Sequence, residues 1–349
     1  MGAAARGWGA VKVFVTGGTG LVGRHVIAAL TGRGDTVRAL ARSDRAAAEL
    51  TALGVEPARG DLSAATRFDP LMEGCDAVVH AAATVLSGGR WEAWHEVNVF
   101  GTERVVRCAA RRGARMIHVS SVAVYGNRLS SGLDRMGHDE GFDLEHAPVP
   151  RDPYERSKRE AELVLWNVAR ETGLSAVALR PCVLYGEGDR HFSPRVAMLL
   201  RRGVAPLIGG GTNHMTLVYA GSVAAAVTCA LDRPGASGPF NVTNDGRLTM
   251  REFVERFAAG LGIRPHWVRI PRGLAWSAAR LWDRTGGALL SPWQTVSLSA
   301  AVQFLAGENP YDSSRATQLL QWRPPLAVAE AAERTGASFR APARPRVRP

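Results

Sequence analysis

The sequence predicts an α/β fold: a doubly wound parallel sheet with a smaller, mostly helical unit towards the C-terminus. Up to Gly186, short apolar stretches rich in β-branched residues alternate with segments of helical apolar spacing. Such alternation is typical of βαβ units, in which parallel strands are buried between two helical layers. Beyond Gly186 the alternation weakens, and helical spacing dominates at Val196–Leu200 and Met250–Leu261. A chain of 349 residues is long enough for two joined domains.

The expected strands are short and apolar, and turns or helical segments separate them. They lie at Val11–Val15, Thr36–Ala41, a stretch ending near Gly60, Asp76–His80, Met116–Val119, Ala176–Arg180 and Phe240–Val242. Between them, helical spacing is clear after Gly20, at Asn98–Arg112 and at Pro153–Arg170.

A glycine-rich turn joins the first expected strand to the first expected helix. Gly17, Gly20 and Gly23 stand three residues apart there. Gly17 would permit the tight turn, Gly20 the close approach of a pyrophosphate, and Gly23 close packing of helix and strand. The helix N-terminus would offer that phosphate free N–H groups and a positive dipole end. The alternative is a turn without a ligand. The position of the glycine-rich turn between a strand and a helix favours a Rossmann-type dinucleotide-binding unit.

The net charge of +11 does not indicate a nucleic-acid-binding protein, because the arginines are scattered and form no basic stripe interleaved with aromatic residues. Lys12 and Lys158 are the only lysines, so 41 of the 43 basic residues are arginines. A lysine retained in such a chain points to a place that needs a compact ammonium.

Tyr154 and Lys158 lie four residues apart at the start of an expected helix, so they share one face. A free phenol has a pKa of about 10 and is a poor base at neutral pH. A neighbouring ammonium favours the phenolate and lowers that pKa. The spacing suits a tyrosine acid/base, although it also occurs by chance in helices. Ser121 follows the fifth expected strand at the sheet edge where ligands bind; its hydroxyl would contact a substrate oxygen or satisfy local backbone.

These residues together resemble the extended short-chain dehydrogenase/reductase superfamily, in its NAD(P)-dependent epimerase/dehydratase and 3β-hydroxysteroid dehydrogenase-like branch. The resemblance covers residues 11–330. The matching segments are TGGTGLVG (16–23), GDL (60–62), HAAA (80–83), NVFGT (98–102), SSVAVYG (120–126), PYERSK (153–158) and LRPCVLYGEGD (179–189).

The resemblance implies roles for individual residues. Tyr154 would be the catalytic acid/base, Lys158 would hold the nicotinamide ribose and tune the tyrosine, and Ser121 would polarise the substrate oxygen. Asn98 would lie in the helix that supports the active site. The matched residues that would line the dinucleotide are Gly17, Gly20, Leu21, Val22, Gly23, Ala81, Ala82 and Pro181, with Asp61 and Leu62 flanking the adenine. No metal site is predicted.

Three departures distinguish the chain from nucleotide-sugar enzymes. Val122-Ala123 stands where sugar-nucleotide dehydratases carry an acidic pair, and Met215-Thr216 stands where nucleotide-sugar enzymes carry Arg-Asp. The motif Arg-Tyr-Phe-Asn of those enzymes is Arg-Pro-Cys-Val at residues 180–183. Without the arginine, a dianionic substrate would be poorly paired. Residues 210–226 and 312–316 resemble instead the steroid-dehydrogenase-like and long-chain ketone reductase branch.

We therefore expect a ketoreductase or alcohol dehydrogenase for a hydrophobic hydroxy or keto compound, steroid-like or long-chain. The alternatives are a nucleotide-sugar epimerase and a non-catalytic NAD(P)-binding regulator. NADP(H) is the expected cofactor and NAD(H) the alternative. Ala41 replaces the acid that would accept the ribose 2′-hydroxyl, while Arg42 and Ser43 would bind a 2′-phosphate. Arg42 would otherwise be one more solvated arginine, and Asp44 would then reach the ribose.

We expect a dinucleotide-binding domain at residues 11–186 and 214–244, a substrate domain at 187–213 and 245–335, and a disordered basic tail at 336–349. The apolar stretch Leu274–Leu305, with three tryptophans, would wall the smaller domain; a substrate-pocket or membrane-surface role is the alternative. A stripe at Ala161, Val164, Leu165 and Val168 would serve a homodimer interface or face the chain's own sheet.

Four widely spaced cysteines without a C-x-x-C pair are expected to be reduced thiols in the cytoplasm. Met1–Ala10 has no apolar segment of signal length, and no apolar run reaches 18 residues, so we expect no transmembrane helix.

Overall fold

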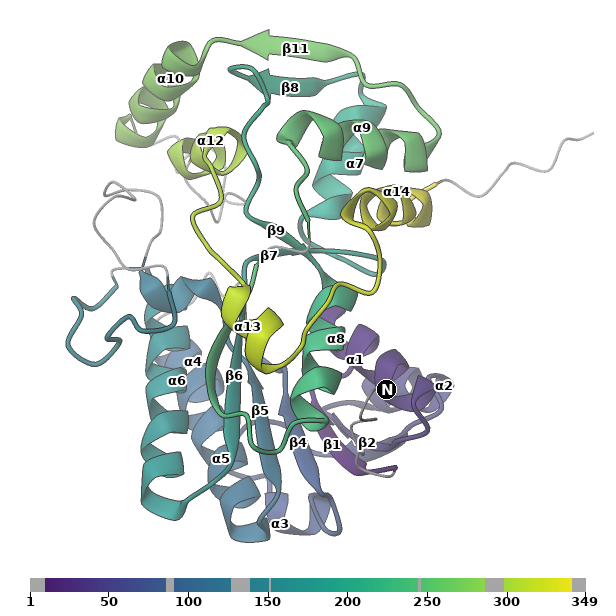
Figure 1. Ribbon diagram of the computed structural model, residues 1–349, viewed down its shortest axis with the longest axis vertical. Coiled ribbons are helices and arrows are strands. Elements are labelled where there is room, and N and C mark those ends of the chain that lie inside the picture. The colour runs from purple at the N-terminus through teal and green to yellow at the C-terminus, as the bar shows by residue number, and fades with distance from the viewer. Residues whose placement is uncertain are drawn as a thin grey trace, which may run out of the picture.

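The computed structural model describes residues 10–85, 91–126, 139–150, 152–243, 246–285 and 298–340. Its central element is a seven-stranded sheet with the order β10-β6-β5-β4-β1-β2-β3 (Figure 1). All neighbouring strands of this sheet run parallel. The strands are β1 (Lys12–Thr16), β2 (Thr36–Ala41), β3 (Glu56–Arg59), β4 (Ala77–His80), β5 (Arg115–Val119), β6 (Ala176–Pro181) and β10 (Gly238–Val242).

The chain winds outward from β1 through β2 to β3 and then from β4 outward on the other side of β1. The topological switch point therefore lies between β1 and β4, where ligands of open α/β sheets bind outside the carboxyl ends of the strands. This order confirms the expected Rossmann-type, doubly wound sheet.

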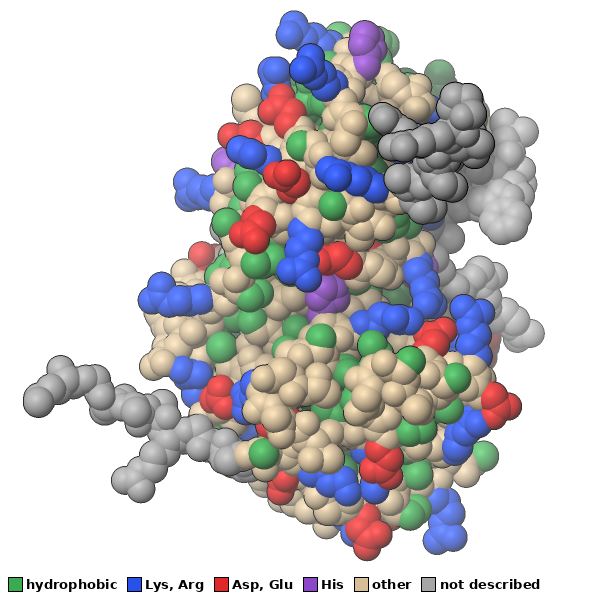
Figure 2. Space-filling model, turned by 90° about the vertical axis from the view of Figure 1, so that its right-hand side faces the viewer, with side chains coloured by type: hydrophobic (Ala, Val, Ile, Leu, Met, Phe, Trp, Pro, Cys, Tyr) green, Lys and Arg blue, Asp and Glu red, His purple; other side chains and the backbone are tan. Residues whose placement is uncertain are grey.

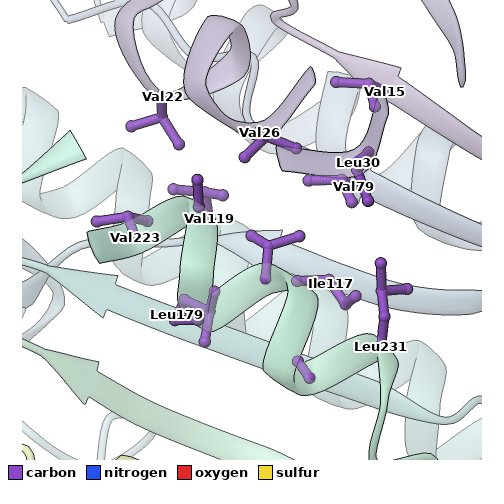
Figure 3. Packing of buried hydrophobic residues seen from close by; sticks show 14 of the residues in the cluster. Val15, Val22, Val26, Leu30, Val79, Ile117, Val119, Leu179, Val223 and Leu231 are labelled. Atoms are coloured by element: carbon purple, nitrogen blue, oxygen red, sulfur yellow. The ribbon is translucent and has the colours of Figure 1, made fainter. Parts of the chain in front are cut away.

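Helices cover both faces of the sheet. One face carries α1 (Leu21–Gly32), α2 (Asp44–Ala52), α8 (Ala220–Leu231) and α13 (Ser314–Leu319); the other carries α3 (Phe68–Leu71), α5 (Gly101–Arg112) and α6 (Pro153–Thr172). Figure 3 shows the first layer, where Val22 and Val26 of α1 and Val223 of α8 meet the apolar side chains of the strands. Burial of strand residues on both faces explains their near-continuous apolar character.

Between β4 and β5 the chain forms one long helical segment in three parts. These are α4 (Trp91–Trp94), the π-helix η1 (His95–Phe100) and α5. The helix expected from Asn98 thus begins inside a π-helical turn, a form that is frequent at functional sites. The short 3₁₀ helix η2 (Val122–Tyr125) follows β5.

A smaller unit lies beyond the carboxyl ends of the strands (Figure 1). It contains α7 (Ser193–Arg201), β8 (Ala205–Ile208), α9 (Met250–Leu261), β11 (Trp267–Ile270), α10 (Arg272–Arg284), α12 (Leu298–Ala306) and α14 (Val328–Ser338). Strand β8 pairs with β11, and β7 (Val183–Tyr185) pairs with β9 (Leu217–Tyr219) in a second two-stranded sheet.

Two expected boundaries differ from the structure. Residues 313–322 do not join the smaller unit, because Ala316 and Trp322 are buried in the core of the central sheet and the Trp322 indole donates a hydrogen bond to Ser222 O (2.8 Å). The expected tail begins too early, since α14 continues to Ser338. Its residues 341–349 lie outside the described part of the chain, as does Trp293 of the tryptophan-bearing stretch.

Most of the apolar stripe of α6 faces the chain's own sheet, while its remaining residue, Val164, is partly exposed. Ala161, Leu165 and Val168 are buried, and the last two belong to the core between α6, α5 and the strands. These side chains are therefore not available for the homodimer interface that the sequence suggested. The spacing identified a buried face but not the surface that buries it.

The described surface mixes charges of both signs. On the face shown in Figure 2, Lys and Arg side chains are interspersed with Asp and Glu. Many arginines form ion pairs, such as Arg24 with Glu49 and Arg107 with Glu171. Among the helices of the described residues, none combines the length and the hydropathy that crossing a membrane requires.

The contact between α9 and α14 generates a stability prediction. A Cβ atom at Gly336 would overlap the carbonyl oxygen of Phe257, so Gly336→Ala should lower the free energy of unfolding by about 1–3 kcal/mol. Gly273 on α10 has open space around it, and Gly273→Ala should be neutral or slightly stabilising because alanine favours helix. Urea unfolding compares the two variants; equal stability would contradict the close packing.

Candidate active site

The residues selected from the sequence follow the carboxyl ends of neighbouring strands. Gly17 follows β1, Arg42 follows β2, Asp61 lies two residues beyond β3, Ala81 follows β4 and Ser121 lies two residues beyond β5. Pro181 is the last residue of β6 and is buried. Because the strands are parallel, all these positions lie along one edge of the sheet.

The glycine-rich turn is packed tightly against the backbone after β4. Gly17 has φ +74°, and a Cβ there would lie 2.6 Å from Ala82 N and 2.7 Å from Ala81 C. A Cβ at Gly23 would overlap Gly17 O, so Gly23 brings α1 close to the turn itself. The space beside Gly18 is also filled, by Ile27 and Leu50, although the sequence analysis gave this residue no role.

The first turn of α1 presents backbone rather than side chains to the sheet edge. Gly20 is exposed with ordinary φ −78°, and α1 has neither a side-chain cap nor an acidic residue in its first turn. Val22 points into the core, while Leu21 is partly exposed. An uncapped helix N-terminus without an acidic residue in its first turn suits a phosphate group.

At the ends of β2 and β3 the polar groups are mostly engaged locally. Arg42 is exposed, whereas Ser43 Oγ accepts a hydrogen bond from Ala46 N (3.2 Å) and caps α2. Asp44 forms an ion pair with Arg59. The local capping of Ser43 leaves its hydroxyl hydrogen available as a donor.

Asp61 and Leu62 serve the loop after β3. The Asp61 carboxylate accepts hydrogen bonds from Ser63 N (2.8 Å) and Thr66 Oγ1 (3.1 Å). The hydrogen bonds from Ser63, assisted by that from Thr66, hold the pKa of Asp61 below its ordinary value. Leu62 is buried against Gly101. The carboxylate is exposed at this edge.

Asn98 is buried and links three segments. Its Oδ1 accepts from Thr84 N (2.8 Å), and its Nδ2 donates to Thr84 O (3.0 Å) and to Ser157 Oγ (2.9 Å). Ser157 Oγ donates in turn to Tyr154 O (2.9 Å). Asn98 therefore fixes the loop after β4 and the first turn of α6 together.

A buried histidine connects this group to the glycine-rich turn. His80 Nδ1 lies 2.6 Å from Thr16 Oγ1, and His80 Nε2 lies 3.0 Å from Thr102 Oγ1, which donates to Asn98 O. Burial, together with the nearby Lys158 ammonium, lowers the pKa of His80 to about 3. The ring is therefore neutral, with one nitrogen as donor and the other as acceptor.

The N-terminal end of α6 carries Tyr154 and Lys158. Asp152 caps this end by accepting hydrogen bonds from Tyr154 N (3.0 Å) and Glu155 N (3.1 Å). Lys158 is buried, and its Nζ donates to Val119 O at the end of β5 (2.9 Å). Burial lowers the pKa of Lys158 to about 8, with Glu162 opposing the shift.

Tyr154 and Ser121 both remain partly exposed beside this buried lysine. The Tyr154 ring meets Trp94 edge to face, with ring centroids 5.9 Å apart. Ser121 Oγ accepts from Ala123 N (3.1 Å) and caps η2, so the local role considered for this serine is present. The Lys158 hydrogen bond joins α6 to Val119, which stands two residues before Ser121 in the chain.

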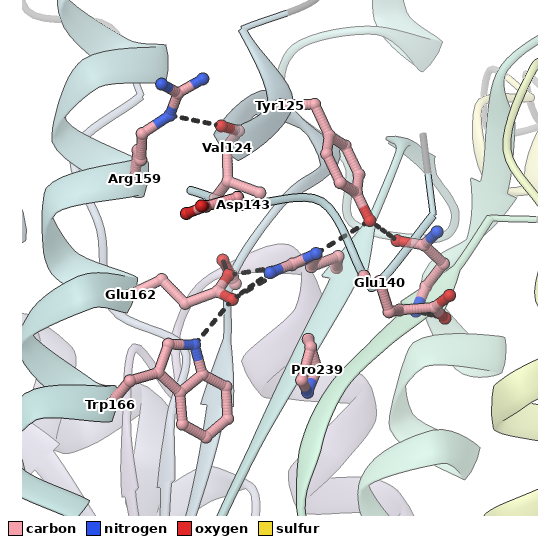
Figure 4. A network of polar contacts seen from close by, with 12 residues as sticks. Val124, Tyr125, Glu140, Asp143, Arg159, Glu162, Trp166 and Pro239 are labelled. Atoms are coloured by element: carbon pink, nitrogen blue, oxygen red, sulfur yellow. Dashed lines mark hydrogen bonds and ion pairs between the residues drawn. The ribbon is translucent and has the colours of Figure 1, made fainter. Parts of the chain in front are cut away.

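A buried ion pair that the sequence motifs did not indicate lies behind these residues. Glu162 and Arg180 have side chains 0% and 1% exposed, and Arg180 Nη2 lies 2.6 Å from Glu162 Oε1. Figure 4 shows Glu162 and Trp166 projecting from α6, with the Trp166 indole turned towards the Glu162 carboxylate. The available signal was spacing: Glu162 stands four residues after Lys158 and eight after Tyr154, on the same helix face.

The glycine-rich turn generates a prediction that separates binding from folding. Gly20→Ala should leave the melting temperature of the protein near that of the native chain, because its Cβ would meet only Gly17 O at 3.1 Å. It should still weaken dinucleotide binding at least tenfold, since the methyl group would stand where backbone must approach phosphate. Gly23→Ala should lower both quantities. Thermal unfolding and NADPH titration measure them; native affinity in Gly20→Ala would contradict the assignment.

Comparisons with known proteins support the family and the fold. The model of the NAD dependent epimerase/dehydratase family matches residues 13–244. A 4-hydroxy-2-methyl-3-oxo-4-farnesyl-3,4-dihydroquinoline-1-oxide ketoreductase from Stigmatella aurantiaca is 31% identical over 89% of this chain and 91% of its own. A 2-alkyl-3-oxoalkanoate reductase from Stenotrophomonas maltophilia is 33% identical over 72% of this chain and 76% of its own.

Epimerases are also among the similar proteins. UDP-glucose 4-epimerase from Vibrio cholerae is 27% identical over 94% of this chain and 95% of its own. The crystal structure of UDP-N-acetylglucosamine 4-epimerase from Bacillus cereus shares the fold, with a TM-score of 0.69, 22% identity and coverage of 95% of this chain and 100% of that one. The chain therefore belongs to the NAD dependent epimerase/dehydratase family, within the extended short-chain dehydrogenases/reductases.

Proposed function

We propose that this oxidoreductase interconverts a hydrophobic ketone and its secondary alcohol, with NADP(H) as the preferred cofactor. The observation that carries the proposal is the contact between Lys158 Nζ and Val119 O. This contact joins the buried Lys158 ammonium to the carboxyl end of β5. The partly exposed phenol of Tyr154 is one helical turn from Lys158, and the Ser121 hydroxyl is two residues beyond Val119. An ammonium, a phenol and a hydroxyl are the groups that proton transfer to a ketone oxygen requires.

Each of the three residues has a distinct part in the proposed reaction. Tyr154 gives its phenolic proton to the carbonyl oxygen during reduction and takes it back during oxidation. Lys158 favours the phenolate and so brings the phenol closer to the pKa that a general acid/base needs at neutral pH. Ser121 donates a hydrogen bond to the developing oxyanion. The nicotinamide, when bound, supplies or accepts the hydride.

The glycine-rich turn fits a dinucleotide. A Cβ would fill the space beside Gly17, and the adjacent helix N-terminus has no acidic residue in its first turn. Gly20 and the backbone of the first turn would bind the pyrophosphate, Asp61 and Leu62 would lie towards the adenine, and Ala81, Ala82 and Pro181 towards the nicotinamide half.

The preference for NADP(H) rests on the charges at the ends of β2 and β3. Arg42 is exposed and Asp44 is held by Arg59, so a 2′-phosphate would meet two guanidiniums and an already paired carboxylate. Arginine binds phosphate well because its donors form a rigid fork. NAD(H) remains the alternative if Asp44 turns to the ribose.

Three observations support an apolar substrate. Met215, at the position of the phosphate-binding arginine of nucleotide-sugar enzymes, is buried in the core of the smaller unit. The ring of Trp94 borders Tyr154. The ketoreductase and reductase among the relatives are named for apolar keto compounds. The epimerase alternative is favoured by the similarity to UDP-glucose 4-epimerase.

The remaining proposals concern location and assembly. We keep the cytoplasm as the proposed location, which the free cysteines Cys75, Cys108, Cys182 and Cys229 suit. A homodimer would have to use surfaces other than the apolar stripe of α6. A peripheral membrane contact would use α10, where Leu274 and Leu281 are each 63% exposed.

The catalytic assignment is tested with a panel of ketones and NADPH, followed by absorbance. The native protein should reduce apolar ketones, and Tyr154→Phe should abolish turnover because it removes the proton donor. NADPH binding should persist in the variant, since the ring is retained. Normal turnover by Tyr154→Phe would overturn the mechanism. Low-micromolar binding of UDP-sugars to the native protein by calorimetry would favour the epimerase.

The cofactor preference is tested at Arg42. Arg42→Ala should weaken NADPH binding roughly tenfold to hundredfold, the scale of lost hydrogen bonds to a charged group, and leave NADH binding nearly unchanged. Arg45 is the matched control, because it is exposed on α2 and pairs with Glu49. Fluorescence titration measures the NADPH and NADH affinities of the native protein, of Arg42→Ala and of Arg45→Ala. Tighter binding of NADH than NADPH by the native protein would make the assignment wrong and direct attention to Asp44.

A further inference from the structure

Glu162 is a buried carboxylate on the same face of α6 as Tyr154 and Lys158. Its side chain is 0% exposed and lies one turn beyond Lys158. Arg180 reaches it with Nε at 3.1 Å from Oε1 and 3.2 Å from Oε2, and with Nη2 at 2.6 Å from Oε1. Trp166 Nε1 donates to Oε1 at 3.1 Å. Arg180 and Trp166 together therefore donate four hydrogen bonds to the carboxylate.

One more donor to Glu162 comes from Ser120, which follows β5 and precedes Ser121. Ser120 Oγ donates to Glu162 Oε2 at 2.5 Å. Val119 O, the preceding position, accepts from Lys158 Nζ, and Ser121 is the next residue. Three successive residues at the end of β5 therefore have three different partners. Val119 contacts Lys158, Ser120 contacts Glu162, and Ser121 would contact the proposed substrate. A shift of α6 by a fraction of a turn would break the first two contacts together.

Arg180 extends the contact into the rest of the sheet. Its Nη1 donates to Tyr125 Oη (2.9 Å), and Tyr125 Oη donates to Asn241 Oδ1 on β10 (2.8 Å). In Figure 4, two dashed lines mark these contacts at the Tyr125 hydroxyl. The chain of contacts runs from α6 through β6 and η2 to β10. It anchors Glu162 to β6, which pairs with β5, and to η2, which Ser121 caps.

We propose that Glu162 is a positioning residue that, through Ser120 and Arg180, fixes α6 and its Tyr154 and Lys158 against the carboxyl end of β5. The proposal rests on the proposed function and deepens it. Productive proton transfer needs its groups placed to well within an ångström, and small displacements lower rates by large factors. Leu165 and Val168 pack α6 against the sheet, and polar contacts in fixed directions add to the precision of that packing.

Glu162 also acts on the charge of Lys158. Three ionisable groups interact electrostatically with Lys158: His80 on β4, His118 on β5 and Glu162 on α6. Tyr154 shares the helix face of Lys158, and Arg180 on β6 pairs with Glu162. Burial lowers the pKa of both histidines, so they are neutral, whereas the Glu162 carboxylate raises the pKa of Lys158 against the effect of burial. The carboxylate therefore helps to keep the lysine cationic.

Three variants separate positioning from mere support of the fold. Ser120→Ala removes the link to β5 and keeps the buried ion pair. Glu162→Asp keeps the charge and shortens its reach. Glu162→Gln removes the charge. Glu160→Gln is the matched control, because Glu160 lies on the same helix but is partly exposed and pairs with Arg156. NADPH binding, kcat, KM for an apolar ketone, melting temperature and the pH profile of kcat/KM are measured for each.

We expect Ser120→Ala and Glu162→Asp to lower kcat about tenfold to hundredfold while NADPH affinity and KM change less than threefold. Glu162→Gln should in addition move the alkaline limb of the profile to lower pH, because Lys158 loses its proton earlier. Glu160→Gln should stay within twofold of the native kcat. Support of the fold alone would lower melting temperatures without moving that limb.

The proposal is overturned if Ser120→Ala and Glu162→Asp both keep native kcat while Tyr154→Phe is inactive. An active Tyr154→Phe would instead refute the proposed function itself, so the two failures are distinguishable. Should Glu162→Gln not fold, the other two variants still decide the question, because both retain the charge that Arg180 needs.

Discussion

The buried ion pair between Glu162 and Arg180 is the contact on which the arrangement of the candidate site depends. Two charges out of contact with water are unfavourable unless each is paired and its remaining hydrogen-bonding groups are satisfied. Burial would raise the pKa of Glu162, but the Arg180 charge and the hydrogen bonds from Arg180, Ser120 and Trp166 outweigh burial and hold it below the ordinary value. The pair thus stays ionised, and removing one partner would strand the other charge at a cost of about 3–5 kcal/mol.

A second constraint lies at the switch point of the sheet, where backbone meets backbone without side chains between. Gly17 and Gly23 leave no room for a methyl group, and the turn rests directly on the segment after β4. His80 spans the same place with a hydrogen bond on each ring nitrogen. The glycine-rich turn and the helical segment that carries Asn98 are therefore held together by direct backbone packing and by the hydrogen bonds of His80.

The two constraints meet at the first turn of α6. Asn98 reaches it from the switch point through Ser157, and Glu162 holds the next turns through Ser120 and Arg180. Tyr154 stands where these two sets of contacts join, with its ring still partly exposed. These contacts would hold a partly exposed tyrosine at the precision that the proposed proton transfer requires.

Local sequence determined the fold class, the strands of the sheet and the glycine-rich turn after β1, because periodicity, β-branched runs and tight turns are properties of neighbouring residues. It also identified Tyr154 with Lys158, since residues four apart share a helix face. Tertiary structure alone decided that Glu162 meets Arg180 and Ser120, that residues 313–322 return to the sheet, and that the stripe of α6 is covered by the chain's own core. Those outcomes depend on which distant segments pack together, and a single sequence carries no direct signal of such pairings.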